Sequence, residues 1–404
     1  MLKAEREGRP RGLPEELVVW EILLHLPPKP LLRCRLVCRS WRRLTSTRAF
    51  LHAHHRRQRP LPFVTGYDID HGGPTFVDFL ALDRRDAAAP AARLQHVARF
   101  SDTAIFVKDS CDGILVLSGR RHDTYAVCNP ATRQYGGLPM LAGFTFMGLY
   151  QHRPTGEYRI LVVRRTMSTF DNISYHVYTL GSGDMPRCIG WWQWVAGCPP
   201  VLFNGSLHWF ETLGDKILVF DTTAESFRWM RAPNIRCKFL FETDGTLGIF
   251  GGAAVVDIWV LQDYEREVWS HKYRVEMPVP EIRGKLDEGD NWEVTVFSDG
   301  GHLLLLVEGK QCLLYFDTDG KLLATFQHDG HTPWMTAVML KQSLVPHAFF
   351  PLLEDNLDSF HFSILKHQFC GHNIIFQSYV EHALLVDAPL VLFGATNYQA
   401  MGNQ

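Results

Sequence analysis

The chain has 404 residues with 46% hydrophobic and 21% charged side chains, so it is long enough for several domains and can bury a sizeable core. Its net charge of −2 is unevenly distributed. Through Arg59 there are 14 Lys and Arg against 5 Asp and Glu, whereas the remainder has 27 against 38. This asymmetry predicts a positive N-terminal head that meets a negatively charged partner.

Cysteine usage and apolar run lengths exclude several protein classes. The nine cysteines are scattered and never form Cys-x-x-Cys, which argues against a disulfide framework or a zinc ribbon and fits a reducing compartment. The first residues contain no apolar signal segment, and a run such as residues 303–307 is far too short to cross a membrane. We therefore expect a protein of the nucleus or cytoplasm with no membrane segment and no cofactor.

Residues 13–41 predict two short amphipathic helices separated by a proline-rich stretch at residues 27–30. Pro14 suits a first helical turn, where its missing N–H would be unpaired in any case. Apolar residues then recur at three- and four-residue spacing around most of the helix surface. A helix this short cannot bury so much apolar surface against itself. The segment therefore needs a partner.

The order Leu-Pro, Ile-Leu, Leu-Pro, Leu-Leu, Val-Cys and Trp in this segment resembles the F-box, a helical module that docks onto a Skp-type adaptor. The stretch from Leu13 to Ile22 is one residue longer than the commonest F-box spacing, with Trp20 as the extra residue. Because an added residue rotates an α-helix by about 100°, it would shift the docking face. The alternative is a helical hairpin that packs on its own chain. The residues that the resemblance assigns to adaptor binding are Leu13, Pro14, Leu17, Ile22, Leu23, Leu26, Pro27, Leu31, Leu32, Arg35, Val37, Cys38 and Trp41.

From Pro60 onward, helical periodicity gives way to short apolar runs broken by Gly, Asp, Asn and Pro, which is typical of β-strands. The predicted strands are residues 114–117, 125–127, 160–163, 175–178, 217–220, 256–260, 303–307 and 313–316.

Several of these strands share one pattern: an apolar strand, an Asn or Asp, a polar turn, and a strand with an aromatic residue. The turn residues are Asn129, Asp221, Asp263 and Asp317, and residues 178–183 supply a plausible further copy. Their side chains can accept hydrogen bonds from the backbone two residues on, which stabilises the turn. A repeat of roughly 40 to 50 residues predicts an antiparallel β-propeller of about six blades.

This second region also resembles a known family. Residues 106–117, 128–133, 154–158, 202–209 and 258–264 look like the F-box-associated domain, which follows an F-box directly in a large plant family. The fold class expected is therefore α plus all-β: a small helical F-box followed by an antiparallel β-propeller-like domain. The domain boundaries expected are a disordered leader at 1–12, the F-box at 13–55, a basic linker at 56–62, the propeller-like domain at 63–395 and a tail at 396–404. Residues 362–365 and 384–392 could be strands that close the ring.

Other residue clusters have both a structural and a functional interpretation. Asp112-Gly113 and Asn204-Gly205 predict type I′ hairpins, since Asn, Asp and Gly tolerate positive φ. His208 is expected to pack in a strand with a hydrogen-bonded imidazole, and Trp191, Trp192 and Trp194 are expected to pack between blades rather than to bind a partner. His361, His367, Cys370 and His372 fit no standard zinc spacing. The carboxylates Glu265 and Glu267, and those of residues 287–290, are explained by exposed turns as well as by glycosidic chemistry.

The sequence is compatible with three functions. The resemblance implies a non-catalytic substrate receptor of an SCF-type (Skp–cullin–F-box) ubiquitin ligase: the head binds the Skp-type adaptor and, through it, the cullin, while the propeller recruits an unknown target. The second is nucleic-acid binding through the Arg-rich head, which the acidic body disfavours. The third is a propeller enzyme acting on glycans, for which the sequence offers no clear acid/base pair.

Overall fold

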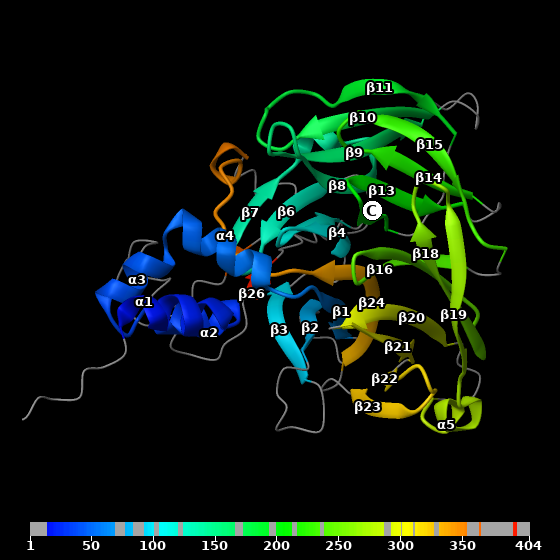
Figure 1. Ribbon diagram of the computed structural model, residues 1–404. Helices are drawn as coiled ribbons and strands as arrows, with labels where there is room; N and C mark the ends of the chain where they lie inside the picture. Colours follow the sequence, from blue (N-terminus) through cyan, green and yellow to red (C-terminus); the bar gives the residue numbers. More distant parts are fainter. Residues whose placement is uncertain are drawn as a thin grey trace, which may run out of the picture.

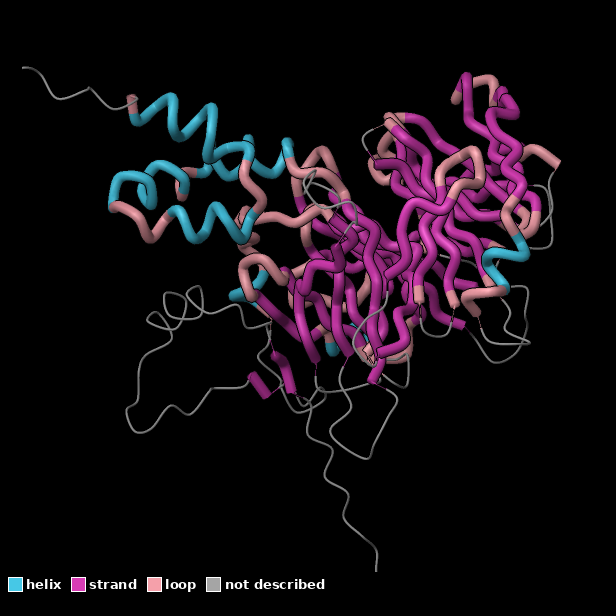
Figure 2. Tube along the Cα trace, turned by 90° about the horizontal axis from the view of Figure 1, so that it is seen from below, coloured by secondary structure: helices cyan, strands magenta, loops and turns pink. Residues whose placement is uncertain are grey.

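The computed structural model consists of a helical head and a ring of β-sheets, which lie side by side (Figure 1). The head occupies one end of the assembly, and its last helix leads into the ring (Figures 1 and 2). The structure describes residues 14–68, 77–83, 93–100, 105–119, 124–165, 173–193, 199–211, 216–234, 238–286, 292–299, 301–309, 312–326, 331–353, 363–364 and 391–393.

The head begins with one continuous helical stretch whose winding changes along its length. It passes from α1 (Glu15–Leu17) through the π-helical η1 (Val18–Ile22) to the 3₁₀ turn η2 (Leu23–His25). Three helices follow: α2 (Pro28–Cys34), α3 (Arg39–Thr45) and α4 (Arg48–Arg57). Two of the prolines expected to separate the helices instead belong to α2, because proline is tolerated in a first helical turn.

Five sheets of the ring each contain four consecutive antiparallel strands. Each hairpin connects neighbouring strands, so one blade is a local unit of chain. In chain order, the strands are β4 (Phe106–Cys111), β5 (Ile114–Ser118), β6 (Tyr125–Asn129) and β7 (Gln134–Gly137); β8 (Thr145–His152), β9 (Glu157–Arg165), β10 (Ile173–Thr179) and β11 (Arg187–Trp192); β12 (Val201–Phe203), β13 (Ser206–Phe210), β14 (Lys216–Asp221) and β15 (Ser226–Arg231); β16 (Lys238–Thr243), β17 (Thr246–Gly251), β18 (Val255–Asp263) and β19 (Val268–Glu276); β20 (Glu293–Asp299), β21 (His302–Glu308), β22 (Leu313–Phe316) and β23 (Leu322–Phe326).

The remaining sheet joins both ends of the propeller and closes the ring. Its order is β24-β1-β2-β3-β26-β25, with β1 (Leu61–Asp68), β2 (Val77–Asp83), β3 (Arg93–Phe100), β24 (His331–Leu340), β25 (Ser363–Ile364) and β26 (Val391–Phe393). The propeller therefore has five regular blades, slightly fewer than the predicted number of about six, and this composite sheet completes the ring. Ring closure comes from antiparallel pairing of β1 with β24, whereas the short strands β25 and β26 add to the outer strand β3.

Three short helical elements lie between or after the blades: η3 (Pro139–Leu141), α5 (Val279–Arg283) and η4 (Phe350–Leu352). The chain passes from α4 to β1 through residues 58–60, inside the span expected as a linker. The expected leader at 1–12 and the tail at 396–404 lie outside the described residues. All eight strand segments predicted from apolar runs are strands in the structure.

The core of the ring lies between neighbouring sheets. One cluster joins blade β8–β11 to blade β12–β15 and contains the fully buried Tyr150, Tyr175 and Phe220. Trp192 completes this contact by stacking on Phe227 at a centroid distance of 5.6 Å. The expected inter-blade role is thus confirmed for Trp192, whereas Trp191 is 58% exposed and Trp194 lies outside the described residues.

The predicted turn chemistry is confirmed at the hairpins. Asp112 and Gly113 have φ of 50° and 84°, and Asn204 and Gly205 have φ of 47° and 72°. The four predicted turn openers each accept two backbone N–H groups; the Asp221 carboxylate, for example, accepts from Thr223 and Ala224 at 2.8 Å. Local side-chain hydrogen bonds therefore set the connection between the last two strands of these blades.

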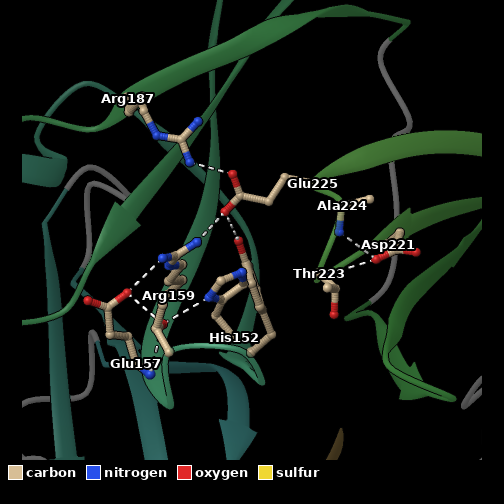
Figure 3. A network of polar contacts seen from close by, with 10 residues as sticks. His152, Glu157, Arg159, Arg187, Asp221, Thr223, Ala224 and Glu225 are labelled. Carbon is tan, nitrogen blue, oxygen red and sulfur yellow. Dashed lines mark hydrogen bonds and ion pairs between the residues drawn. The ribbon is translucent and has the colours of Figure 1, made fainter.

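The turn that Asp221 opens also anchors one blade to the next (Figure 3). Glu225, with φ of 50°, points its carboxylate into blade β8–β11. There it accepts a hydrogen bond from Arg159 at 2.8 Å, one from Tyr150 at 3.2 Å and a further one from Arg187. Burial alone would raise the pKa of Glu225, but the hydrogen bonds and charges of these arginines outweigh it and lower that pKa.

We expect Glu225→Ala to lower the free energy of unfolding by about 2 kcal/mol, because the half-buried Arg159 guanidinium loses an ionic partner. Glu157→Ala is the matched control: Glu157 also bonds Arg159, at 2.6 Å, but its side chain is 46% exposed. Exposed ion pairs contribute little, so the control should change stability by less than about 1 kcal/mol. Thermal unfolding of the two variants tests this, and equal effects would contradict it.

Gly113 tests the hairpin that carries Asp112. A Cβ at this position would lie 2.6 Å from Ser343 Cβ and 2.7 Å from the Ser343 backbone nitrogen. Gly113→Ala should therefore destabilise the protein by about 3 kcal/mol, from positive φ and this clash together. At Gly183 φ is +73° and no atom lies within 4 Å of an added Cβ, so Gly183→Ala should cost only about 1 kcal/mol. Unfolding midpoints that fall equally would show that the approach of Ser343 does not matter.

Candidate docking surface and its attachment to the propeller

The first helical stretch of the head has a buried face and an exposed apolar face. Val19, Leu23 and Leu24 are 1–3% exposed and pack in the head's own core. Leu17 and Ile22, on the other face, are 49% and 47% exposed. Apolar side chains on an exposed helical face of this kind are typical of a protein-docking site.

The turn between α2 and α3 adds to the exposed apolar surface. Leu36 and Val37 lie in this turn and are 41% and 68% exposed. The hydroxyl of Ser40 donates a hydrogen bond of 2.7 Å to the Glu15 carboxylate, which holds the start of α3 beside α1. We call Leu17, Trp20, Ile22, Leu36 and Val37 the docking surface; Trp20 is 40% exposed.

The residues assigned to adaptor binding from the sequence fall into four groups. Pro14, Leu17, Ile22 and Val37 are exposed. Leu26, Pro27, Leu32, Arg35, Cys38 and Trp41 are half-buried, and Leu23 and Leu31 are buried in the head's own core. Leu13 lies outside the described residues.

Two of the half-buried residues have clear internal partners. Arg35 donates hydrogen bonds to the Thr45 hydroxyl at 3.1 Å and to the Thr45 carbonyl at 2.7 Å. The Cys38 sulfur accepts the backbone N–H of Trp41 at 3.4 Å, which caps α3. These residues therefore shape the turn that presents Val37.

Sequence reasoning missed two members of the docking surface. The F-box resemblance does not include Leu36, which stands between Arg35 and the Val-Cys pair. The signal for it in the sequence is an apolar residue in a turn, where no helix face can bury it. Trp20 was noted only as the extra residue of a longer spacing. The π-helical η1 accommodates Trp20 within one wider turn. The exposed face is therefore not rotated by the about 100° that one more α-helical residue would add.

The head is attached to the ring by an apolar contact through α4. Phe50 and Leu51 are 0% and 6% exposed and belong to one cluster with Leu344, which follows the ring-closing strand. Val345 and Ala131 pack against the same cluster. The core of the head therefore includes residues from the far end of the propeller domain.

Asp112 makes the polar part of this attachment. His55 of α4 lies with Nε2 3.0 Å from one carboxylate oxygen of Asp112, and the Tyr158 hydroxyl donates to the other at 2.9 Å. Burial alone would raise the pKa of Asp112, but the bonds from His55 and Tyr158 outweigh it, and the pKa lies below its usual range. The rings of His347 and Tyr158 pack edge to face with their centroids 5.0 Å apart. Burial of His347 lowers the pKa of its imidazole to about 4.

We expect Asp112→Asn to loosen the head from the ring. The hydrogen bonds to a charged carboxylate are lost, so amide hydrogen exchange in α4 should accelerate about tenfold. Asp244 has the same place in the β16–β17 hairpin, with φ of 47°, and Asp244→Asn is the matched control with unchanged exchange.

The stability difference between wild type and Asp112→Asn should also depend on pH. Because the pKa of Asp112 is lowered in the folded protein, its contribution is present above the unfolded-state pKa of about 3.9 and is lost as the pH falls through the folded value. The difference in unfolding midpoint between wild type and Asp112→Asn should thus be largest near neutral pH and vanish in acid. A constant difference would show that the charge of Asp112 is not involved.

Among the described residues of the ring, the candidate chemical groups make structural contacts. His208 is buried and bonded to the Val201 carbonyl and the Tyr264 hydroxyl, as expected from the sequence; burial lowers its pKa to about 4. Glu267 binds Arg228 at 3.2 Å and the Arg231 backbone N–H at 2.9 Å, so it holds two blades together instead of pairing with Glu265.

A hollow of about 300 Å³ lies nearby, with Asp221, Arg228, Tyr264 and Glu265 in its wall. The Asp221 carboxylate accepts hydrogen bonds from the backbone of its own turn. The Arg228 guanidinium lies 5.2 Å from the centroid of the Tyr264 ring and forms an ion pair with Glu267. Within the described ranges, no three His, Cys, Asp or Glu side chains form a metal-binding group. The acidic residues 287–290 and the cluster His361, His367, Cys370 and His372 lie outside those ranges. No described helix has the length and apolarity that a membrane crossing requires.

Comparison with known proteins accounts for both parts of the chain. Residues 12–52 match the F-box domain, and residues 78–350 match the F-box associated beta propeller domain. The F-box protein At5g49610 of Arabidopsis thaliana is 25% identical over 375 residues, covering 82% of this chain and 97% of that protein. The F-box protein CPR1 of the same plant is 23% identical over 383 residues, covering 81% and 87%.

Proposed function

The chain belongs to the F-box proteins that carry an F-box-associated β-propeller domain, and from this premise we propose that it is a substrate-receptor subunit of an SCF-type ubiquitin ligase. The head binds the Skp-type adaptor and, through it, the cullin. The propeller recruits a target protein for ubiquitination. The observation that carries the proposal is the docking surface, whose five apolar side chains are 40–68% exposed on a head that is anchored to the ring.

The apolar docking surface supplies the affinity of the proposed adaptor contact. Its helical part and the turn at Val37 are held in place by Ser40–Glu15 and Arg35–Thr45 hydrogen bonds. A surface that is already ordered loses less conformational entropy on binding than a flexible one. Burial of these side chains in a partner then stabilises the complex through the hydrophobic effect.

The charges of the head also favour a Skp-type adaptor with an acidic surface as the partner. Arg33, Arg39, Arg42 and Arg43 are exposed beside the docking surface, on the positive segment of the chain. An acidic adaptor surface would be steered toward them, which accelerates encounter more than it tightens the final complex. Association should therefore slow as ionic strength rises.

The propeller contributes to the proposed function by holding a target in a fixed place relative to the adaptor. The fixed attachment through Asp112 and Phe50 keeps a target bound on the ring at a defined distance from an adaptor bound on the head. Ubiquitin transfer is then promoted by proximity, with the bond-making groups supplied by other subunits. Asp221, Tyr264 and Arg228, in the wall of the hollow, are already bonded to other groups of the ring, which is consistent with a binding role for this chain.

Val37→Glu tests the adaptor contact. A carboxylate at a position that is 68% exposed should leave the head folded but place an unpaired charge in the proposed interface. Affinity for a purified plant Skp-type adaptor, measured by biolayer interferometry, should fall at least about a hundredfold. Leu352→Glu is the matched control, since Leu352 is 67% exposed on the propeller side. Wild-type protein that fails to bind the adaptor, or equal binding by Val37→Glu, would contradict the proposed function.

A further inference from the structure

The π-helical turn η1 is the most unusual backbone feature of the head. The N–H of Leu23 donates to the carbonyls of both Val18 and Val19, five and four residues back, whereas Val18 itself bonds Pro14 in the α-helical manner. A π turn holds one more residue than an α turn and is often found at functional sites. Here the extra residue lies within a stretch that ends in the tight 3₁₀ turn η2.

This turn keeps the two faces of the stretch separate. In an α-helix, residues five apart are separated by about 140°. A π turn brings them closer together, because its hydrogen bonds join residues five apart. Leu17 and Ile22 are five apart and both about half exposed, while Val19 and Leu24, also five apart, are both buried. The added residue thus extends the exposed face without disturbing the buried one.

Trp20 is the large side chain that this arrangement adds to the exposed face. Its ring centroid lies 5.6 Å from that of Phe50, at an interplanar angle of 57°. Phe50 is fully buried and belongs to α4, the helix that is bound to the propeller. Trp20 nevertheless remains 40% exposed, so part of the ring rests on α4 and part is open to a partner.

We propose that Trp20 is a partner-contacting residue of this head: it widens the docking surface from α1 toward α4 and inserts its open ring edge into an apolar site of the Skp-type adaptor. The inference rests on the proposed function. It gives a binding role to Trp20, which in the sequence is only the extra residue of a longer spacing. Trp20 lies between the exposed Leu17 and Ile22 in the same helical stretch.

Two physical properties favour this role. Tryptophan buries a large apolar area with few rotatable bonds and is enriched among the residues that dominate binding energy. The contact with Phe50 restricts the Trp20 ring before binding, so less side-chain entropy is lost when a partner covers it. Because Phe50 lies in α4, the partner would then contact the part of the head that is directly joined to the ring.

Oxidative footprinting of the intact protein tests this without altering the chain. Hydroxyl radicals modify exposed indole rings, and mass spectrometry reports each tryptophan separately. Saturation with purified plant Skp-type adaptor should slow modification of Trp20 at least fivefold. Trp191, 58% exposed on β11 of the propeller, is the internal control and should be modified at an unchanged rate. Unchanged modification of Trp20 in a protein that does bind the adaptor would overturn the inference.

Affinity measurements with two matched variants complete the test. Trp20→Ala should weaken adaptor binding about tenfold and Trp191→Ala should leave it unchanged. Trp20→Phe, which retains an aromatic ring over Phe50, should recover part of the loss and guards against a head that unfolds without an aromatic residue there. Wild-type affinity in a folded Trp20→Ala protein would refute the role of Trp20 while leaving the proposed function intact. No binding by wild type would refute the proposed function itself.

Discussion

The architecture depends on one carboxylate in a tight hairpin. Asp112 stands at the turn between β4 and β5 with a positive φ, and its two oxygens bind different parts of the molecule: His55 from the head and Tyr158 from the neighbouring blade. Gly113 allows the segment at Ser343 to pass close to this turn. Head, first regular blade, second blade and the chain beyond the ring-closing strand therefore meet at a single point. Removal of the charge would weaken the bonds to His55 and to Tyr158 at once.

The features that local chemistry determines could be predicted from the sequence. Asp112-Gly113 and Asn204-Gly205 form the expected hairpins because few residues accept their backbone angles, and Asp221 and Asp263 open turns by bonding their own backbone. Short patterns of the same kind also predict the F-box and the propeller-like regions.

Contacts between residues distant in sequence escaped prediction. Glu225 and Arg159 are 66 residues apart, and nothing near either residue indicates the other. The ring closes through β24 instead of the apolar runs near the C-terminus, because β24 pairs with β1 along most of its length. Trp20 looked like an irregular spacing, since its effect depends on Phe50 in another helix. The exposed part of the predicted docking site could be separated from its buried part only once the helices were packed.

The sharing of core residues between the head and the segment after β24 has a consequence for synthesis on the ribosome. Residues up to Leu51 emerge first, but Leu344, which packs on Phe50 and Leu51, follows 293 residues later. At roughly 5–20 residues per second, this delay is roughly 15–60 s. During that time the head has an incomplete core, and a chain that terminates before residue 344 never completes it. A head with a complete core therefore requires a chain translated at least to residue 344, which includes the whole of the ring-closing strand β24.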